Sequence, residues 1–521
     1  MAIELSDLLF TEQDDIVPEA GQSDQIVNTY ITNTLAGNDS ITGTIPDDAP
    51  YDENYYGFKN EGILNTADGD DIITGKAGYD PSSGSGGFNI INWGTLNTGE
   101  GDDLIDGTQG NYNSLTHSGI DATGTLNAGG GDDTITGGGT QDGIRVGTGT
   151  LNMGEGNDLI DAFGGYWGIG ISLSDGGTID TGNGDDSIIS VQGFFNGGEV
   201  FLGEGNDSII VTRYSYLEYQ SALYNENTIE TGDGNDSIMS DRKIINTGEV
   251  FLGEGNDLFL ASGLDNYNNI EGGDGNDIIG GSGLTYNEGV IETGNGDDSI
   301  NSEGTLLNKG NVFLGENDDS IISLGTFVNR GNVFLGENND SITANTGSDY
   351  DRNLENFSFI GTGDGNDIIT SNGIIYNEGV IETGNGDDSI IVDGGIDDIT
   401  GNTYSIYNNG GAINMGDGND SIIANEGFES AENSSGAWFL GEGEDYIKGY
   451  GSGDFYGGNG NDTLELTSGT YTVGIWGEAG ESPIFTRGDQ LMITSEFEKL
   501  KAGSTIYDFT SLTAGQIIIV A

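Results

Sequence analysis

Short apolar stretches with period-two alternation recur along most of the chain. In Val250-Phe251-Leu252 and Val333-Phe334-Leu335 the outer residues are predicted to face inward and the middle residue outward. A second apolar pair follows a recurrent aspartate, with Ile two residues after it in 16 of 18 copies. These segments are rich in Gly, Asn, Asp and β-branched residues, which disfavours helices. Each repeat is therefore predicted to hold two short β-strands.

The repeat is the string G-x-G-[DN]-D-x-I, exemplified by Gly182–Asp186 and Gly384–Asp388. Eighteen copies occur when single departures are allowed, and six of the 17 intervals between them are 21 residues long. A fixed period of this size indicates stacked coils whose like residues form columns. We predict an all-β fold, a right-handed parallel β-solenoid (similar to a β-roll or β-helix) of about 18 coils with a base period of 21 residues.

Two turns are predicted to close each coil. The acidic turn has Gly two residues before its last Asp in 16 copies, and Asn317 or Asn338 in the other two. Because Gly and Asn tolerate positive φ, this position is predicted to be left-handed. The other turn reads N-x-G, as in Asn246-Thr247-Gly248, and we interpret its Asn and Gly in the same way.

Longer intervals contain insertions between the Ile strand and the N-x-G turn. They are expected to project from one edge of the solenoid, opposite the acidic turns. The main insertions are Pro46–Asn60, Lys76–Phe88, Thr108–Thr123, Thr212–Asn225 and Asp393–Tyr407.

The ends of the chain lack the repeat. Residues 1–30 are predicted to be an N-terminal cap, residues 31–465 the repeat solenoid, and residues 466–521 a C-terminal cap. Atypical ends are expected because a solenoid must cover its open core. The aliphatic tail from Gln516 to Ala521 is also compatible with a secretion signal.

Composition and charge narrow the function. The chain has 87 acidic and 13 basic residues, a net charge of −74, with no Cys and a single histidine, His117. This charge excludes nucleic-acid binding and disfavours anionic membranes, while the missing Cys and His exclude thiolate and multi-histidine metal sites. No apolar run is long enough for a membrane-spanning helix, so no membrane insertion is expected.

The acidic turns are the candidate metal sites. Stacked coils lie about 4.8 Å apart, and two unit charges at that separation repel by about 3 kcal/mol at an effective dielectric of 20. Flexible turns that carry hard oxygen ligands are typical of Ca²⁺ sites. The predicted ligands are the final aspartates Asp39, Asp71, Asp103, Asp133, Asp158, Asp186, Asp207, Asp236, Asp257, Asp277, Asp298, Asp319, Asp340, Asp367, Asp388, Asp420, Asp445 and Asp462.

These turns resemble the calcium-binding nonapeptide G-G-x-G-x-D-x-U-x of RTX (hemolysin-type) proteins. The full form is present in Gly272–Asp277 and Gly457–Asp462, and the resemblance covers residues of about 35 to 465. It implies a parallel β-roll that binds Ca²⁺ between successive turns through the Asp carboxylate and turn carbonyls. It also implies type I secretion through an uncleaved C-terminal signal, hence an extracellular or cell-surface location.

The chain departs from the family pattern in ways that change the expected site. The family's coil has 18 residues with calcium on both edges, whereas here the coil has 21 residues and only one edge carries the motif. We therefore expect a single file of ions and a metal-free N-x-G edge. Leu35 and Ala67 replace the first motif Gly, and Asn317 and Asn338 replace the second.

We expect a non-enzymatic protein, since neither H-E-x-x-H nor G-x-S-x-G occurs. The expected role is structural or adhesive, at the cell surface or in an extracellular matrix, with calcium ions as partners and surface polysaccharide or self-association as further partners. The alternative is a secreted ligand-binding module for glycan or ice that uses edge loops or an outward face. A short outward Asn ladder and a stripe of outward Phe are open candidates for such a face: Asn65, Asn97, Asn127 and Asn152; Phe201, Phe251, Phe313, Phe334 and Phe439.

Overall fold

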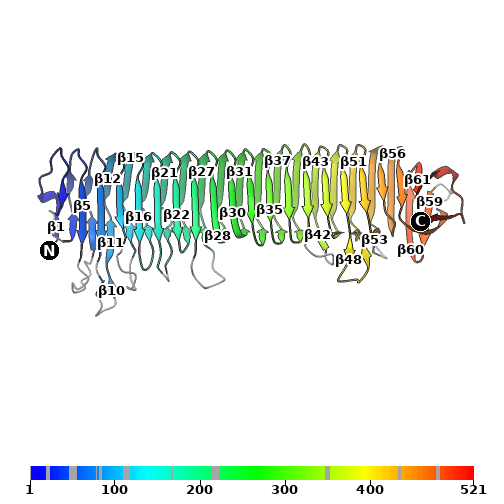
Figure 1. Ribbon diagram of the computed structural model, residues 1–521, viewed down its shortest axis with the longest axis horizontal. Coiled ribbons are helices and arrows are strands. Elements are labelled where there is room, and N and C mark those ends of the chain that lie inside the picture. Colours follow the sequence, from blue (N-terminus) through cyan, green and yellow to red (C-terminus); the bar gives the residue numbers. More distant parts are fainter. Residues whose placement is uncertain are drawn as a thin grey trace. The chain divides into compact units, whose positions relative to one another are not determined.

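The protein is built almost entirely from short parallel β-strands stacked as rungs (Figure 1). The computed structural model describes residues 2–18, 24–45, 56–77, 79–80, 85–108, 118–165, 168–213, 222–345, 352–431, 436–476 and 482–521. It divides into two units, residues 1–273 and 274–521, and each is described by itself. The only helical elements in the described part are η1 (Leu5–Asp7) and η2 (Phe509–Ser511).

Most coils hold three strands rather than the two predicted. One coil of the first unit consists of β22 (Ser187–Val191), β23 (Phe194–Asn196) and β24 (Glu199–Glu204). They pair in parallel with β25 (Ser208–Thr212), β26 (Leu223–Asn225) and β27 (Thr228–Asp233) of the next coil. The additional strand is the middle one, which has three residues in this coil and ends on the Asn of the N-x-G turn. The predicted parallel β-solenoid is confirmed within each unit.

The strands fall into three series. First strands, which follow the acidic turn, are β2 (Ile16–Val17), β5 (Ser40–Thr44), β8 (Ile72–Lys76), β13 (Leu104–Gly107), β16 (Thr134–Gly138), β19 (Leu159–Phe163), β32 (Ile278–Gly281), β35 (Ser299–Ser302), β38 (Ser320–Ser323), β41 (Ser341–Ala344), β44 (Ile368–Ser371), β47 (Ser389–Val392), β52 (Ser421–Ala424), β55 (Tyr446–Lys448) and β57 (Thr463–Leu466). Middle strands are β1 (Ile3–Glu4), β3 (Ile26–Asn28), β6 (Tyr56–Asn60), β11 (Phe88–Asn92), β14 (Ile120–Ala122), β17 (Ile144–Val146), β20 (Ile171–Leu173), β33 (Thr285–Asn287), β36 (Leu306–Asn308), β39 (Phe327–Asn329), β42 (Arg352–Asn356), β45 (Ile374–Asn377), β50 (Ile406–Asn408) and β53 (Phe428–Ser430). In β28 (Ser237–Asn246) and β30 (Leu258–Asn266) the first and middle strands are continuous.

Third strands lead into the acidic turn. They are β4 (Ile31–Asn33), β7 (Ile63–Asn65), β12 (Thr95–Glu100), β15 (Thr125–Gly130), β18 (Thr150–Glu155), β21 (Thr178–Asn183), β29 (Glu249–Glu254), β31 (Asn269–Asp274), β34 (Val290–Asn295), β37 (Asn311–Glu316), β40 (Asn332–Glu337), β43 (Phe359–Asp364), β46 (Val380–Asn385), β51 (Ala412–Asp417), β54 (Ala437–Gly443) and β56 (Gly453–Gly460). Two short antiparallel pairs lie in insertions, β9 (Tyr79–Asp80) with β10 (Ser85–Gly86) and β48 (Gly395–Ile396) with β49 (Thr403–Tyr404).

The core consists of columns of like apolar residues. Ile188 pairs in register with Ile209, and both side chains are buried. Val250 and Leu252 are also buried while Phe251 between them is partly exposed, as the period-two pattern predicts. Burial of such columns is the main apolar contribution to stability.

The acidic turn has the predicted left-handed backbone. Asn317 and Asn338 have φ of 88° and 81°, and the corresponding glycines have positive φ as well. Glycine is also favoured because successive coils approach closely there. A Cβ on Gly205 would lie 1.9 Å from the carbonyl oxygen of Gly184 in the previous coil.

The interpretation of the N-x-G turn was wrong. Asn225 and Asn246 are buried in strands and do not have positive φ. The Nδ2 of Asn225 donates to the Oδ1 of Asn246 one coil on, at 2.8 Å, and the Nδ2 of Asn196 donates to Asn225 in the same way. This column of buried amides, the amide column, recurs in the second unit. In the first unit it is interrupted over three coils, where Ala122, Val146 and Leu173 take the Asn position.

The chain ends take part in the ladder. In the region predicted as a separate cap, β1 pairs with β3 and β2 pairs with β5, so residues 1–30 include an irregular first coil. At the other end the parallel order gives way to antiparallel strands: β58 (Gly469–Trp476), β59 (Ser482–Arg487), β60 (Gln490–Ser495), β61 (Lys499–Ala502), β62 (Thr505–Asp508) and β63 (Ile517–Val520). None of the helices in the described residues is long and apolar enough to cross a membrane. His117 lies outside the described residues.

Candidate metal centre

The final aspartates of the acidic turns form one column in each unit, the aspartate column. All 18 side chains are buried, with exposed fractions between 0 and 3%. A first strand starts at the residue directly after each of these aspartates. The pairing of the first strands therefore fixes the position of the aspartates along the solenoid axis. The structure thus brings the predicted ligands into a single file within each unit.

One carboxylate oxygen of each aspartate takes part in a hydrogen-bond ladder. The backbone N–H of Asp186 donates to Oδ1 of Asp207 at 2.7 Å, and the N–H of Asp207 donates to Oδ1 of Asp236 at the same distance. The second unit repeats this geometry, at 2.8 Å from Asp319 to Asp340. Each Oδ1 therefore accepts from the coil before it.

The other carboxylate oxygen has no such partner. In 16 of the turns the Oδ2 atom is buried and accepts no hydrogen bond within the described part of the chain. These atoms belong to Asp39, Asp71, Asp103, Asp133, Asp158, Asp186, Asp207, Asp236, Asp298, Asp319, Asp340, Asp367, Asp388, Asp420, Asp445 and Asp462. A buried, unsatisfied charged oxygen is costly, so a repeated orphan of this kind points to a ligand.

The neighbouring position shows that the hydrogen-bond ladder alone does not demand aspartate. One residue earlier, Oδ1 of Asp185 accepts the N–H of Asn206 at 2.8 Å, and Oδ1 of Asn206 accepts the N–H of Asn235 at 3.0 Å. This exposed ladder runs in the opposite direction and uses Asp and Asn interchangeably. An amide oxygen would serve the buried ladder equally well, yet all 18 turns have Asp there. The second oxygen therefore has a separate role.

Burial makes these carboxylates hard to ionise without a counter-charge. It raises the pKa of Asp71, Asp186 and Asp207 to about 7, and that of Asp340 to about 8. Neighbouring aspartates add to the effect, since the charges of Asp367 and Asp319 also raise the pKa of Asp340. At neutral pH the site therefore favours either a proton or a bound cation.

The donor set fits a hard divalent cation. Each turn offers a buried carboxylate oxygen and glycine carbonyls directed toward the next coil, and many turns add exposed acidic side chains such as Glu204 and Asp233. All are oxygen ligands, which Ca²⁺ prefers in flexible coordination. Within the described ranges, three or more Asp, Glu or His side chains do not converge into a metal-binding cluster.

Two acidic residues that sequence reasoning missed complete the ladder. At the start, the N–H of Asp15 donates to Oδ1 of Asp39 at 2.8 Å. At the end, Oε2 of Glu498 accepts the N–H of Asp462 at 2.8 Å, and Glu496 has a φ of 62° at the position of the turn glycine. Both residues keep one feature of the repeat, an apolar residue two positions later: Val17 after Asp15 and Leu500 after Glu498. Neither turn contains the glycines of the motif, so the pattern alone did not identify them.

Comparisons with known proteins place the chain in no family. No family model matches the sequence, and no curated protein matches it. Among solved structures, the chain is similar to a hyperactive, Ca²⁺-dependent, β-helical antifreeze protein from an Antarctic bacterium. The identity is 17%, the match covers 79% of this chain and 83% of that chain, and the TM-score is 0.23. A likeness at this score carries no argument, so the RTX resemblance depends on the repeat motif itself.

Proposed function

We propose that this protein is a calcium-dependent β-solenoid whose aspartate column holds a file of Ca²⁺ ions, and that it has a structural or adhesive role outside the cell. The observation that carries the proposal is the buried Oδ2 without a hydrogen-bond partner, repeated in 16 turns. It is supported by Asp at all 18 final positions, where Asn would satisfy the backbone equally well.

The chain's own residues prepare the site. The Oδ1 atoms fix each carboxylate to the backbone of the preceding coil, and this leaves Oδ2 as the remaining donor. Turn glycines let successive coils approach closely, as at Gly184 and Gly205. A bound Ca²⁺ supplies positive charge and oxygen coordination. Binding to the folded state alone stabilises that state by mass action.

The location and biological role extend the same proposal. Type I export and an extracellular or cell-surface location follow from the RTX-like repeats. A repeated and nearly identical site suits a structural ion better than a single catalytic centre, so the proposal includes no enzymatic activity. Surface polysaccharide or a second copy of the chain is the proposed adhesive partner.

Metal counting tests the proposal. The full chain is dialysed against millimolar Ca²⁺, and bound metal per chain is measured by elemental analysis. We expect many ions per chain, up to one per gap between the repeat turns, and poor replacement by Mg²⁺, which requires rigid octahedral geometry. Asp207→Asn should lower the count by one or two ions, whereas Asp185→Asn in the exposed ladder should leave it unchanged. A chain that retains no Ca²⁺ would refute the proposal.

An ice-binding face is a second candidate, because the first unit has a regular outward array. Thr95, Thr125, Thr150 and Thr178 stand in register on adjacent strands. Beside them lies a row of asparagines in which Asn97 donates to Asn65 and Asn127 donates to Asn97, each at 2.6 Å. Such a row has a fixed spacing of about 4.8 Å, which a repetitive solid lattice can match.

The array of Thr and Asn side chains extends over only a few coils. It gives way to Asp180 and Phe201 in the following coils. Thermal hysteresis of the calcium-loaded protein, compared with Thr125→Tyr, measures ice binding directly. A folded protein without hysteresis would leave the structural role as the better proposal.

A further inference from the structure

The insertion after β47 in the second unit forms an ordered strap, defined here as residues 393–404. Its two short strands, β48 and β49, pair antiparallel, with Gly395 opposite Tyr404 and Ile396 opposite Thr403. The amide of Gly401 donates to the carbonyl of Asp397 at 2.6 Å, which closes the loop between them. The strap is therefore a folded element rather than a loose loop.

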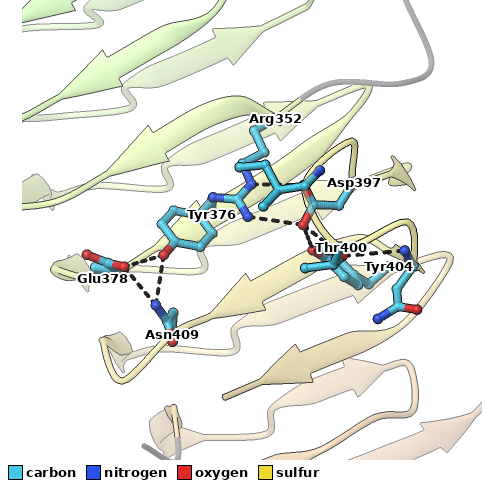
Figure 2. Close-up of polar contacts among 9 residues, drawn as sticks. Arg352, Tyr376, Glu378, Asp397, Thr400, Tyr404 and Asn409 are labelled. Carbon is cyan, nitrogen blue, oxygen red and sulfur yellow. Dashed lines mark hydrogen bonds and ion pairs between the residues drawn. The ribbon is translucent and has the colours of Figure 1, made fainter. Parts of the chain in front are cut away.

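A buried ion pair fastens the strap to the solenoid (Figure 2). Arg352, at the start of β42, donates from Nε to Oδ1 of Asp397 at 3.2 Å and from Nη2 to Oδ2 at 3.0 Å. Asp397 is 1% exposed and also accepts from the hydroxyls of Tyr404 and Thr400. The Arg352 guanidinium lies 3.7 Å from the ring centre of Tyr376.

This clamp holds the strap in one conformation. Although burial opposes ionisation, the hydrogen bonds from Arg352, Tyr404, Ile399 and Thr400 lower the pKa of Asp397 to about 2. A buried ion pair adds little net stability because both groups lose their hydration. Its two-pronged geometry does, however, fix position and orientation. The clamp therefore gives the strap a preset place beside the coils.

A shallow cavity of about 540 Å³, open to solvent, lies between the strap and the solenoid. The strap contributes Asp393, Ile396 and Thr403, and neighbouring coils contribute Asn372, Asn425 and Glu426. The carboxylate of Asp393 accepts from Nδ2 of Asn425 at 3.0 Å, which joins the two sides. Its volume falls in the range of roughly 300–1,000 Å³ that is typical of small-ligand sites.

We infer that this cavity, the strap pocket, binds a neutral saccharide. Its two carboxylates, two amides and one hydroxyl match the hydroxyl groups of a sugar, which both donate and accept hydrogen bonds. Ile396, 39% exposed, offers an apolar contact for the C–H face of the ring. None of the described residues that line the pocket is basic, and the two acids repel anionic ligands. The pocket therefore disfavours phosphates, sulfates and uronates, and among sugars it fits an uncharged one.

The test uses the full chain with calcium held constant, so that the solenoid's metal state does not change between samples. Maltotetraose, cellotetraose and chitotetraose are titrated as neutral probes, with trigalacturonate as the acidic probe. Binding is followed by saturation-transfer NMR and calorimetry. We expect saturable binding of at least one neutral probe and none of trigalacturonate.

Variants place the bound sugar in the strap pocket. Glu426→Ala removes an exposed side chain and should weaken binding at least tenfold. Its matched control is Glu303→Ala, since Glu303 precedes Gly304 in its own coil as Glu426 precedes Gly427. Arg352→Lys loses the two-pronged grip on Asp397 and should also weaken binding, with an unchanged β-sheet circular dichroism spectrum.

Three results would overturn the inference: no saturable binding of any neutral probe at 10 mM, equal weakening by Glu303→Ala and Glu426→Ala, or preference for trigalacturonate. Each is independent of calcium binding by the aspartate column. A metal count that fails with saccharide binding intact would refute only the calcium proposal.

Discussion

The two buried polar columns, amide and aspartate, meet the same need to stack like residues with different chemistry. In the amide column, Asn225 donates to Asn246 and accepts from Asn196, so every member is satisfied by its neighbours. In the aspartate column, Asp207 accepts the N–H of Asp186 through one oxygen, while its second oxygen has no hydrogen-bond partner among the described residues. An amide carries both a donor and an acceptor, whereas an ionised carboxylate only accepts.

This difference bears on the proposed calcium binding, because only one of the two columns lacks a partner for some of its oxygens. Stacked amides satisfy one another's hydrogen bonds and carry no charge, so the amide column requires no bound ion or proton. A stack of carboxylates needs one positive partner, proton or cation, for each remaining oxygen. The amide column is thus expected to stabilise the coil in all conditions, and the aspartate column only when it is neutralised.

Removal of calcium should give the largest effect. In excess chelator at pH 8, the aspartate column retains its repulsion, and the apolar columns must also offset the conformational entropy of 95 glycines. We expect the chain to lose most of its β-sheet circular dichroism and to expand in small-angle scattering, and both changes to reverse on addition of millimolar Ca²⁺. A compact, fully β-structured chain in chelator at low salt would contradict this expectation.

The response to pH should reverse with metal. In the folded chain burial raises the pKa of Asp133 and Asp319 to about 7 and that of Asp103 to about 6, above the usual 3.9 of an unfolded Asp. Metal-free stability is therefore fully present below about pH 4 and is lost as pH rises from there through about 7. With Ca²⁺, protons compete for the same oxygens, so stability should fall as pH drops through that window.

Thermal unfolding at pH 5 and pH 8, with and without Ca²⁺, measures this reversal. The metal-free protein should have the higher midpoint at pH 5, and the calcium-loaded protein at pH 8. The same sign of pH dependence in both series would show that the aspartate column is not the titrating element.

Exchanging the two residue types should separate the columns. Asn225→Asp removes the donor to Asn246 and buries a new charge beside it, which should cost about 2–4 kcal/mol with or without calcium. Asp207→Asn keeps the acceptor for Asp186 but removes the charge. It should destabilise the calcium-loaded protein and stabilise the chelated one.

Denaturant unfolding of both variants in Ca²⁺ and in chelator provides the measurement. Asp185→Asn is the matched control, because that exposed ladder already alternates Asp and Asn, and it should change stability by less than about 0.5 kcal/mol. If Asp207→Asn has the same sign in both conditions, its carboxylate does not bind the metal.

The smallest effect is expected at the turn backbone. Asn317→Ala should cost about 1 kcal/mol, because φ there is 88° and alanine resists the left-handed region. Asn317→Gly should be nearly neutral, since glycine relieves strain but has more freedom in the unfolded chain. A matched pair of unfolding curves in Ca²⁺ decides the order, and a neutral alanine variant would argue against strain at this position.

The sequence predicted the structure correctly at positions where a residue type has one usual structural role. Ile two residues after each recurrent Asp indicates a stacked core, and Asn at a glycine position indicates positive φ, as Asn338 shows. It failed where one type has several uses. The N-x-G asparagines looked like turn residues, but they are buried amides, and the strand that carries them is commonly three residues long with a variable middle residue.

The column of motif aspartates was anticipated from the repeat, but two acidic residues that extend its hydrogen-bond ladder were not. The 18 motif aspartates share a column in each unit, because a first strand begins directly after each of them and these strands pair in register. Asp15 and Glu498 escaped because their turns lack the glycines, and only the pairing of Val17 with Ile41 and of Leu500 with Leu464 reveals their register. The strap pocket could not be predicted, because it depends on how one insertion folds back onto the solenoid.

The longer insertions enter their coils at the same corner, between the first and middle strands. Ile188 and Ile209 are 21 residues apart and Ile209 and Ile238 are 29 apart, yet both pairs are in register. Loops of different length therefore leave the columns undisturbed. Within a unit, successive coils are spaced by about 4.8 Å along the solenoid axis. The number of coils between two insertions therefore sets the distance between them. An insertion can therefore be added to or changed in one coil, at a defined distance from the others, without a change in the stacked strands.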